Sequence, residues 1–520
     1  MTVRGTRRRG RLLLPLTAAA VALALASCST TDPGTGTGDG TPVRGGEIVS
    51  VQSGAISSWH PGAVSAAQTF QRMQAVYGLL MYVDEAGVVQ PSIAESFETE
   101  DGGKTWTLVL NEGVTFTDGT PFNAEAVKFN WDAIAEAGLG GGVANSFQSE
   151  VIDELTLELV ADPIDPTLAY RIAESLTFIA SPDSLGDQGV EYSTPVGAGP
   201  FILESADAAE GEEYVRNDDY FVEGQPYADS FRTVIIADPA QRTQTVIQGG
   251  ADMMNGYEFW FDDAIGNPAV EMYRIESGGF RNFVFNTTAE PFSDVRARQA
   301  VAMVIDPNAL VQANMSDPTL EGSTSIFPTQ SPYYDAKFEL SADLDAAQKL
   351  IDEVLADGIS PDVKLLVPAA PENLRTSELI QLAVQQLEGL NVTLEQVPLS
   401  DWRTIAFAND DFDISFYPGI YDLNPVSTSL PNALGTDGRE NFSNFSHPDM
   451  DAALAELRGA SDEAGRKAAV RAIQEVFVEQ LPFVPFAVDY RTFLLNSDMQ
   501  NVVSVRPYIL LTDQIWFANQ

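Results

Sequence analysis

The sequence predicts a chain of mixed α/β and α+β architecture that folds into two or more lobes. At roughly 100 to 200 residues per domain, its 520 residues are enough for about three compact units. Strand-like and helix-like patterns mix without a regular order in residues 105–176, whereas residues 363–394 read as strand, helix and strand. An α/β unit that follows an α+β unit predicts separate lobes, and small ligands bind preferentially between lobes.

The α+β part is predicted from local patterns. Residues 105–110 alternate as a half-buried strand does, and residues 114–116, with turn residues on both sides, predict the second strand of a hairpin. Asn123 is predicted to cap the helix that follows. Alternating leucines at residues 155–159 predict another strand, and Asp165 before a proline predicts the start of another helix.

The α/β part is one strand–helix–strand pattern. Residues 363–367 are a short apolar strand, residues 376–390 carry leucines on one helical face, and residues 392–394 are apolar again. This order predicts a βαβ unit, in which the two strands are parallel and the crossover is right-handed.

The first 27 residues have the pattern of a secretory signal peptide. Five arginines at residues 4–11 precede an apolar stretch at residues 12–26, which is short for a membrane span. The stretch runs into Leu25-Ala26-Ser27-Cys28, which resembles the bacterial lipobox, in which the cysteine is diacylated and becomes the mature N-terminus. Cys28 is therefore the predicted lipidation site and anchors the protein in the lipid bilayer. A secreted protein without a lipid, or a retained membrane span, is the alternative.

A flexible tether is predicted next. Apart from Cys28 and Val43, residues 28–43 are glycine, threonine, serine, proline and aspartate, which cannot form a packed core. Later segments are too short or too polar to cross a bilayer. The sequence therefore predicts a folded part at the extracellular face of the cell membrane.

Charge and composition narrow the possible partners and chemistry. The chain has 74 acidic and 29 basic residues, a formal net charge of -45, so nucleic acid is not an expected partner. With one cysteine and two histidines, the sequence predicts no disulfide, no metal centre and no cofactor. It contains no HExxH, GxSxG or Walker sequence, which predicts a binding protein and not an enzyme. A surface hydrolase or an adhesin is the alternative.

A series of short motifs carries a family resemblance. The motifs are YGLL (77–80), QPSIAESFE (90–98), KTWTLVLNEGVTFTDGTPFNAEAV (104–127), PVGAGPF (195–201), RNDDYF (216–221), FNTT (285–288), DVRARQA (294–300), NFSNFSHPDMD (441–451) and LPFVP (481–485). In this order and spacing they resemble the signature of the family 5 extracellular solute-binding proteins, the oligopeptide, dipeptide and nickel receptors of ABC importers. The resemblance covers the chain from Glu47 to the C-terminus. Because their glycines and aromatic residues suit turns and cores, the motifs identify the scaffold and not the ligand.

The resemblance implies a bilobal, periplasmic-binding-protein-like fold of three domains, with a hinge and a ligand cleft between two lobes that close. Domain I is assembled from separate segments, domain II is inserted within it, and domain III is the second lobe. Carried onto this chain, domain I is residues 44–76, 190–282 and 487–520, domain II is residues 77–189, and domain III is residues 283–486.

The resemblance also implies the function of a substrate-binding receptor. Such a receptor captures a small solute, here predicted to be a short peptide, and passes it to the permease subunits of an ABC importer. We expect a monomer that is held at the membrane through acylated Cys28. A non-peptide solute, such as an oligosaccharide or a metal chelate, is the alternative ligand.

Candidate ligand contacts follow from the same resemblance. Residues 417–425 resemble a family loop in which an acidic residue pairs with the peptide amine. If the alignment with the family loop contains one deletion, Asp422 takes the place of that acid. If the alignment has no gap, Tyr421 takes its place. Tyrosines suit a half-buried wall of a site, and plain packing is the alternative. The remaining candidates are Tyr417 in the same loop, Trp402, which matches a tryptophan of the family pocket, and Asn441, which matches a loop at the cleft edge.

Overall fold

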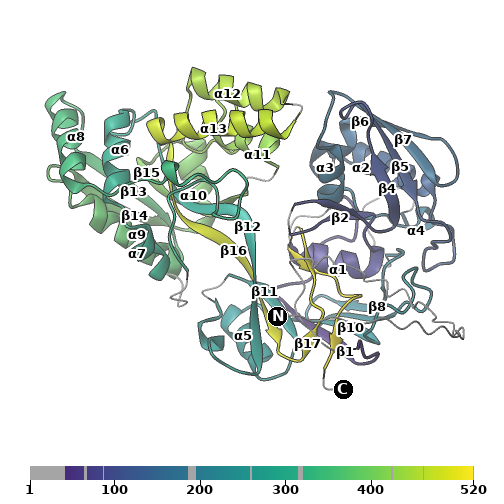
Figure 1. Ribbon diagram of the computed structural model, residues 1–520. Coiled ribbons are helices and arrows are strands. Elements are labelled where there is room, and N and C mark those ends of the chain that lie inside the picture. The colour runs from purple at the N-terminus through teal and green to yellow at the C-terminus, as the bar shows by residue number, and fades with distance from the viewer. Residues whose placement is uncertain are drawn as a thin grey trace, which may run out of the picture. The chain divides into compact units, whose positions relative to one another are not determined.

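The computed structural model describes residues 41–63, 67–85, 87–185, 195–257, 260–313, 320–422, 425–460, 462–506 and 508–518 (Figure 1). The predicted signal peptide, the lipidation site Cys28 and nearly all of the predicted tether lie outside these residues. None of the described helices is long and apolar enough to cross a membrane.

The chain up to residue 185 contains a small sheet and neighbouring helices. Its elements are β1 (Glu47–Gln52), α1 (Ala67–Tyr77), β2 (Met81–Val83), β3 (Val89–Pro91), β4 (Ala94–Glu98), β5 (Thr105–Leu110), α2 (Ala124–Glu136), η1 (Gly140–Asn145), β6 (Phe147–Val151), β7 (Thr156–Ala161), α3 (Leu168–Ser175) and α4 (Pro182–Leu185). Strands β4, β5, β7 and β6 pair in that order as an antiparallel sheet. The predicted cap of α2 is confirmed, because Asn123 Oδ1 accepts a hydrogen bond from the Ala126 N–H at 3.0 Å.

The predicted hairpin at residues 105–116 is wrong. Both edges of β5 are already paired, one with β4 and the other with β7, so no edge remains for residues 114–116. These residues instead form a tight loop, in which the Phe122 N–H donates to the Val114 carbonyl at 3.0 Å. Helix α3 also begins three residues after Asp165, because the Asp165 carboxylate first accepts a hydrogen bond from the Thr167 N–H at 2.8 Å.

The rest of the described chain supplies most of the strands. Its first half contains β8 (Phe201–Asp207), β9 (Gly211–Arg216), β10 (Ser230–Ile235), α5 (Pro239–Ile247), β11 (Met253–Gly256), η3 (Asp262–Ala264), β12 (Val270–Phe285), α6 (Val295–Val304), α7 (Pro307–Gln312), η4 (Ala336–Phe338), α8 (Leu344–Ala356) and β13 (Asp362–Pro368). Its second half contains α9 (Pro371–Val384), β14 (Asn391–Val397), α10 (Leu399–Arg403), η5 (Thr404–Ala408), β15 (Ile414–Asp422), α11 (Val426–Leu434), α12 (Pro448–Gly459), α13 (Glu463–Gln480), β16 (Phe483–Asn496), β17 (Met499–Gln500), β18 (Ser504–Val505), β19 (Ile509–Leu510) and β20 (Trp516–Phe517).

Ten strands from distant parts of the chain form one mixed sheet. Their order is β14-β13-β15-β12-β16-β11-β1-β10-β9-β8. Strands β13 and β14 run parallel from Asp362↔Asn391 to Pro368↔Val397, which confirms the predicted βαβ unit. The helix between them begins at Pro371, earlier than predicted, because a proline fits the first turn of a helix.

Strands β12 and β16 are the longest of this sheet, and they pair with each other along most of their length (Figure 1). One half of β12 also pairs with β15, at Gly279–Phe285, and one half of β16 pairs with β11, at Thr492–Leu495. Between these stretches, residues 275–278 of β12 and 489–491 of β16 pair with no third strand of the described chain. We call this two-stranded stretch the crossing.

The crossing contains a bulge. The register shifts between the pairs Glu276↔Tyr490 and Phe280↔Val488, which leaves two more residues in β12 than in β16. Extra residues of this kind interrupt the ladder of backbone hydrogen bonds and bend the strand that carries them. The backbone ladder between β12 and β16 is therefore interrupted within the crossing.

Buried apolar side chains form separate clusters on the two sides of the crossing. The largest cluster draws on residues 280–487, and a second draws on residues 80–198. A third gathers residues 48–79, 178–275 and 493–517, and a smaller fourth cluster lies around Val49 and Met254. The chain thus packs as several units, whereas the boundaries of the three predicted domains stay a prediction.

A buried acid, Asp513, lines a cavity of about 220 Å³ beside α1. Asp513 is 6% exposed, and its Oδ2 accepts a hydrogen bond from the Tyr220 hydroxyl at 3.3 Å. Among the described residues that line this cavity, none carries a positive charge. Burial raises the pKa of Asp513 to about 6, so near neutral pH the side chain is a buried anion without a charged partner.

Asp513 should make the stability of the protein depend on pH. Because its folded-state pKa of about 6 lies above the ordinary value of 3.8, the folded state binds the proton more tightly than the unfolded chain does. The free energy of unfolding should therefore fall as the pH rises from about 4 to about 6 and stay lower above it. Asp513→Asn removes the buried charge and should raise the free energy of unfolding at pH 7.5 by about 1 to 3 kcal/mol.

Chemical denaturation of both proteins between pH 4 and pH 7.5 measures this effect. The increase in the free energy of unfolding that Asp513→Asn causes should become smaller toward pH 4, where the wild-type side chain is protonated. Asp218→Asn, at an exposed acid, is the matched control and should not change the pH dependence. If the free energy of unfolding had the same pH dependence in the wild type and in Asp513→Asn, the prediction would be contradicted.

Candidate functional site

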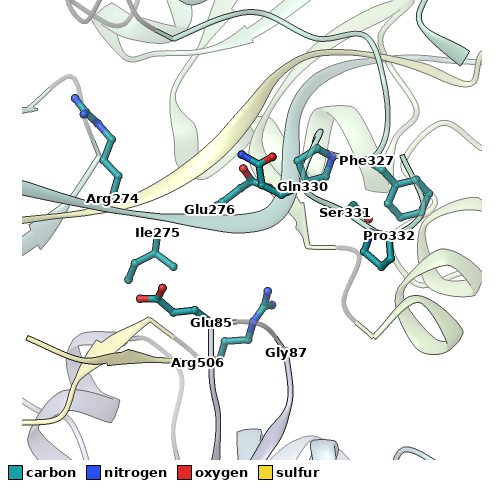
Figure 2. Close-up of a pocket in the computed structure, with 11 residues that line it drawn as sticks. Glu85, Gly87, Arg274, Ile275, Glu276, Phe327, Gln330, Ser331, Pro332 and Arg506 are labelled. Atoms are coloured by element: carbon teal, nitrogen blue, oxygen red, sulfur yellow. The ribbon is translucent and has the colours of Figure 1, made fainter. Parts of the chain in front are cut away.

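A cavity of about 370 Å³ lies beside the crossing. Four segments that are far apart in the sequence line it: the loop after β2, the middle of β12, residues 327–332, and Arg506 after β18 (Figure 2). Sites for small molecules have volumes of about 300 to 1,000 Å³, so this cavity is large enough for one. The charged residues in its lining are Glu85, Arg274, Glu276 and Arg506.

Glu85 joins three of the segments around the cavity. Its Oε1 accepts one hydrogen bond from the Tyr273 hydroxyl at 2.6 Å and another from the Ser504 hydroxyl at 2.5 Å. Burial, followed by the hydrogen bond to Glu85, raises the pKa of Tyr273, so this hydroxyl keeps its proton and remains a donor. The Glu85 carboxylate is therefore fixed in position against β12 and β18.

Arg506 supplies positive charge from the C-terminal part of the chain. Its backbone N–H donates to the Val83 carbonyl at 2.8 Å, which attaches this segment to β2. The side chain is buried, its Nη1 donates to the Tyr508 hydroxyl at 3.4 Å, and its guanidinium lies 5.6 Å from the centre of the Tyr508 ring. A guanidinium held in this way keeps a fixed orientation, because planar stacking restricts its rotation.

The middle of β12 presents side chains on two sides of the strand. Figure 2 shows Ile275 on the side of β12 that faces Glu85 and Arg506, and Glu276 on the side of Gln330. Burial raises the pKa of Glu276, because removal from water disfavours its charged form. A positive group of a ligand placed beside Glu276 would offset this cost.

Three predicted ligand contacts lie on β15, next to the crossing. The backbones of Asp422 and Tyr421 pair with Gly279 and Phe280 of β12, and the backbone of Tyr417 pairs with Asn282. The side chains of Tyr417, Tyr421 and Asp422 are outside the described part of the structure. Their contact with a ligand stays a prediction, now with a known position for the backbone.

The other two predicted contacts are engaged within the protein. Trp402 is fully buried in the largest core cluster, and its Nε1–H donates to the Ser415 hydroxyl at 3.0 Å. The Asn441 amide closes its own loop, donating to the Phe445 carbonyl at 2.7 Å and accepting from the Ser443 hydroxyl at 2.9 Å. Neither residue lines the cavity beside the crossing, and ligand contact stays a prediction for both.

Sequence analysis did not single out Glu85, Glu276 or Arg506. No local motif marks them, because their meeting depends on the pairing of β12 and on the bridge between Val83 and Arg506. One signal was present in the sequence: Gly278 and Gly279 interrupt a strand-like run, and glycines in a strand indicate a bulge or a close approach of another chain segment.

The family model of the bacterial extracellular solute-binding proteins, family 5, matches residues 88–441. The glutathione-binding protein GsiB of Escherichia coli (strain K12) is 23% identical over 439 residues, which cover 80% of this chain and 83% of that protein. Heme-binding protein A of Haemophilus influenzae is 23% identical over 454 residues, which cover 80% and 82%.

A solved structure has the same fold. The ABC transporter substrate binding protein CtaP of Listeria monocytogenes superimposes with a TM-score of 0.81 at 19% identity, covering 92% of this chain and 100% of that one. The predicted mixed α/β fold of periplasmic binding proteins is therefore confirmed. The family match spans most of the folded chain, and its members are binding proteins. The chain belongs to the bacterial extracellular solute-binding proteins of family 5, the substrate-binding receptors of ABC importers.

Proposed function

We propose that this chain is a receptor that captures short peptides outside the cell and delivers them to the permease subunits of an ABC importer. The observation that carries the proposal is the cavity of about 370 Å³ beside the crossing, where two acids and two arginines from three segments meet. A peptide has an ammonium at one end and a carboxylate at the other. A cavity with charges of both signs can complement both ends.

The relatives bear on the choice of ligand. GsiB is named for glutathione, which is a tripeptide, and this supports a peptide ligand. Heme-binding protein A is named for a ligand that is not a peptide, so a non-peptide solute such as a metal chelate or an oligosaccharide is the second candidate. Mass spectrometry of the solute released from denatured, freshly purified protein separates the two candidates.

Capture is proposed to involve closure of two lobes about the crossing. Domain I (residues 44–76, 190–282 and 487–520) with domain II (residues 77–189) forms one lobe, and domain III (residues 283–486) forms the other. Only β12 and β16 pair within the crossing, and the bulge weakens their ladder there, so bending at this point breaks few backbone hydrogen bonds. Contacts that the ligand makes only in the closed state supply the free energy for closure.

Closure should be visible in solution. Small-angle scattering of ligand-free protein, and of the same protein saturated with its released solute, should show a smaller radius of gyration for the bound form. The two forms are prepared from one sample by unfolding, dialysis and refolding, so that only the ligand differs. An unchanged radius of gyration would argue against closure and leave a rigid receptor.

Membrane attachment is proposed to occur through Cys28, with the protein as a monomer at the extracellular face. Cys28→Ser should prevent diacylation, and the protein should move from the membrane fraction to the medium, because two acyl chains are needed for stable anchoring. Immunoblots of the two fractions measure the change, with Ser29→Ala as the control. Equal retention of Cys28→Ser would exclude the lipid anchor.

Asp422 is proposed to pair with the α-amino group of the peptide, with Tyr417, Tyr421, Trp402 and Asn441 as further contacts of the closed site. The backbone pairing of Asp422 with Gly279 places this residue beside the crossing, which supports the proposal. An ammonium and a carboxylate that lose water together stabilise each other only as a pair. Tyr421 in the role of the acid is the alternative alignment.

Removal of the Asp422 carboxylate should weaken binding strongly. Asp422→Asn should cost about 3 to 5 kcal/mol if the pair is buried, which is a loss of about two to three and a half decades in affinity. Calorimetry with the released solute, and with its N-acetylated form, measures the effect. Asp345→Asn, at an exposed acid on α8, is the control and should bind as the wild type does. If mutation and acetylation both leave the affinity within about threefold, the peptide-amine proposal fails.

A further inference from the structure

Three arginines and two tyrosines alternate in a continuous stack beside the crossing. The guanidinium of Arg281 lies 5.7 Å from the centre of the Tyr257 ring, and that of Arg491 lies 5.9 Å from the same ring. Arg491 also lies 5.7 Å from the centre of the Tyr508 ring, and Arg506 lies 5.6 Å from it. We call this set the arginine–tyrosine stack. Its last member, Arg506, lines the cavity of about 370 Å³, so stack and cavity are continuous.

Strand pairing explains how the central members meet. Strand β11 ends at Gly256, which pairs with Thr492 of β16, so the next residues of the two segments, Tyr257 and Arg491, lie side by side. Tyr508 has a φ of 69°, in the left-handed region that residues other than glycine rarely adopt. A strained backbone of this kind persists only where surrounding contacts hold it, and it is typical of functional sites.

Arg491 differs from the arginines at the two ends of the stack. Arg281 forms an ion pair with Asp489, with Nε 3.1 Å from Oδ1, and Arg506 donates a hydrogen bond to the Tyr508 hydroxyl. Within the described part of the chain, the half-buried Arg491 side chain contacts the faces of two rings, and no carboxylate or other acceptor pairs with its guanidinium. Acids outnumber bases by 74 to 29 in this chain, so the lack of an acid partner here is unusual.

Arg491 is not among the residues that line the cavity, but it lies on the same face of the crossing as one of them. It pairs in register with Ile275, and directly paired residues of two strands place their side chains on the same face of a sheet. Ile275 lies on the side of β12 that faces Glu85 and Arg506 (Figure 2). The N–H donors of Arg491 are thus held, by two rings, on the cavity side of the crossing.

We propose that Arg491 binds a carboxylate of the transported solute, and that for a peptide this group is the C-terminal carboxylate. The inference rests on the proposed function and adds the residue that recognises the anionic end of the ligand. A guanidinium matches a carboxylate with two parallel N–H···O bonds, and its orientation within the stack is already fixed. Arg506 adds positive charge on one side and strengthens the attraction for an anion, whereas the charge of Arg281 is compensated by Asp489.

The spacing along β12 fits a short peptide. Arg491 pairs with Ile275 and Asp422 pairs with Gly279, four residues further along β12. At about 3.3 Å per residue this is at most about 13 Å along β12. Strands β15 and β16 flank β12 on opposite sides and lie about 10 Å apart, so the two backbones are at most about 16 Å apart. An extended peptide of about four or five residues has this length, so its two ends can reach Arg491 and Asp422 together.

The test uses a synthetic pool of peptides of two to six residues, one half with free carboxylates and the other half amidated at the C-terminus. Ligand-free protein is mixed with the pool, and native mass spectrometry identifies what it retains. The wild type should retain free-acid peptides, chiefly those of about four or five residues, at least about thirtyfold better than their amides. Arg491→Gln should lose this preference, and Arg491→Lys should recover part of it, because it keeps the charge without the planar fork.

Controls separate the possible failures. Arg458→Gln, at an exposed arginine of α12, makes the same change in net charge and should bind as the wild type does. Thermal unfolding of each variant shows that it is folded. If the wild type retains acids and amides equally, or if Arg491→Gln binds unchanged, the inference is overturned and the peptide receptor stands. If the wild type retains neither half of the pool, the peptide function fails, and the role of Arg491 as a peptide-carboxylate site fails with it.

Discussion

The pairing of β12 with β16 is the contact on which the rest of the structure depends. These strands join β15 to β11 within one sheet, and they are the only described strands that pair in the crossing. Their register places Ile275 beside Arg491, and both face the cavity side of the sheet. Because side chains alternate along a strand, a slip of one residue would turn this set to the opposite face. One ladder of backbone hydrogen bonds therefore determines the geometry of the site.

Much of the fold could be predicted from the sequence, because many of its signals are local. The strand at residues 105–110, the cap at Asn123 and the βαβ unit each depend on side chains within a few turns of one another. The predicted hairpin was wrong because the partner of a strand can lie far away in the sequence. Strand β5 pairs with β7, almost fifty residues later, and not with residues 114–116. The family motifs added the overall fold, which no local pattern contains.

The site could be predicted only in part. Motif resemblance pointed to β15, whose backbone does lie against the crossing, and to Trp402 and Asn441, which hydrogen-bond within their own packing unit. Glu85 and Arg506 lie at opposite ends of the sequence and meet through one backbone bridge and one carboxylate that accepts two hydroxyl donors. Such contacts follow from topology, so apart from the pair Gly278 and Gly279 no local pattern in the sequence indicates them.

The order of strands also affects how the chain reaches its folded state. Strand β16 begins at Phe483, near the end of the chain, and its partner β12 precedes all the helices from α6 to α13. Until the last segment has been synthesised, β12 and β11 lack the strand that joins them, and their edges can pair with other chains. Loops this long close slowly. The ten-stranded sheet can therefore be completed only once β16, near the end of the chain, is available to pair with both β11 and β12.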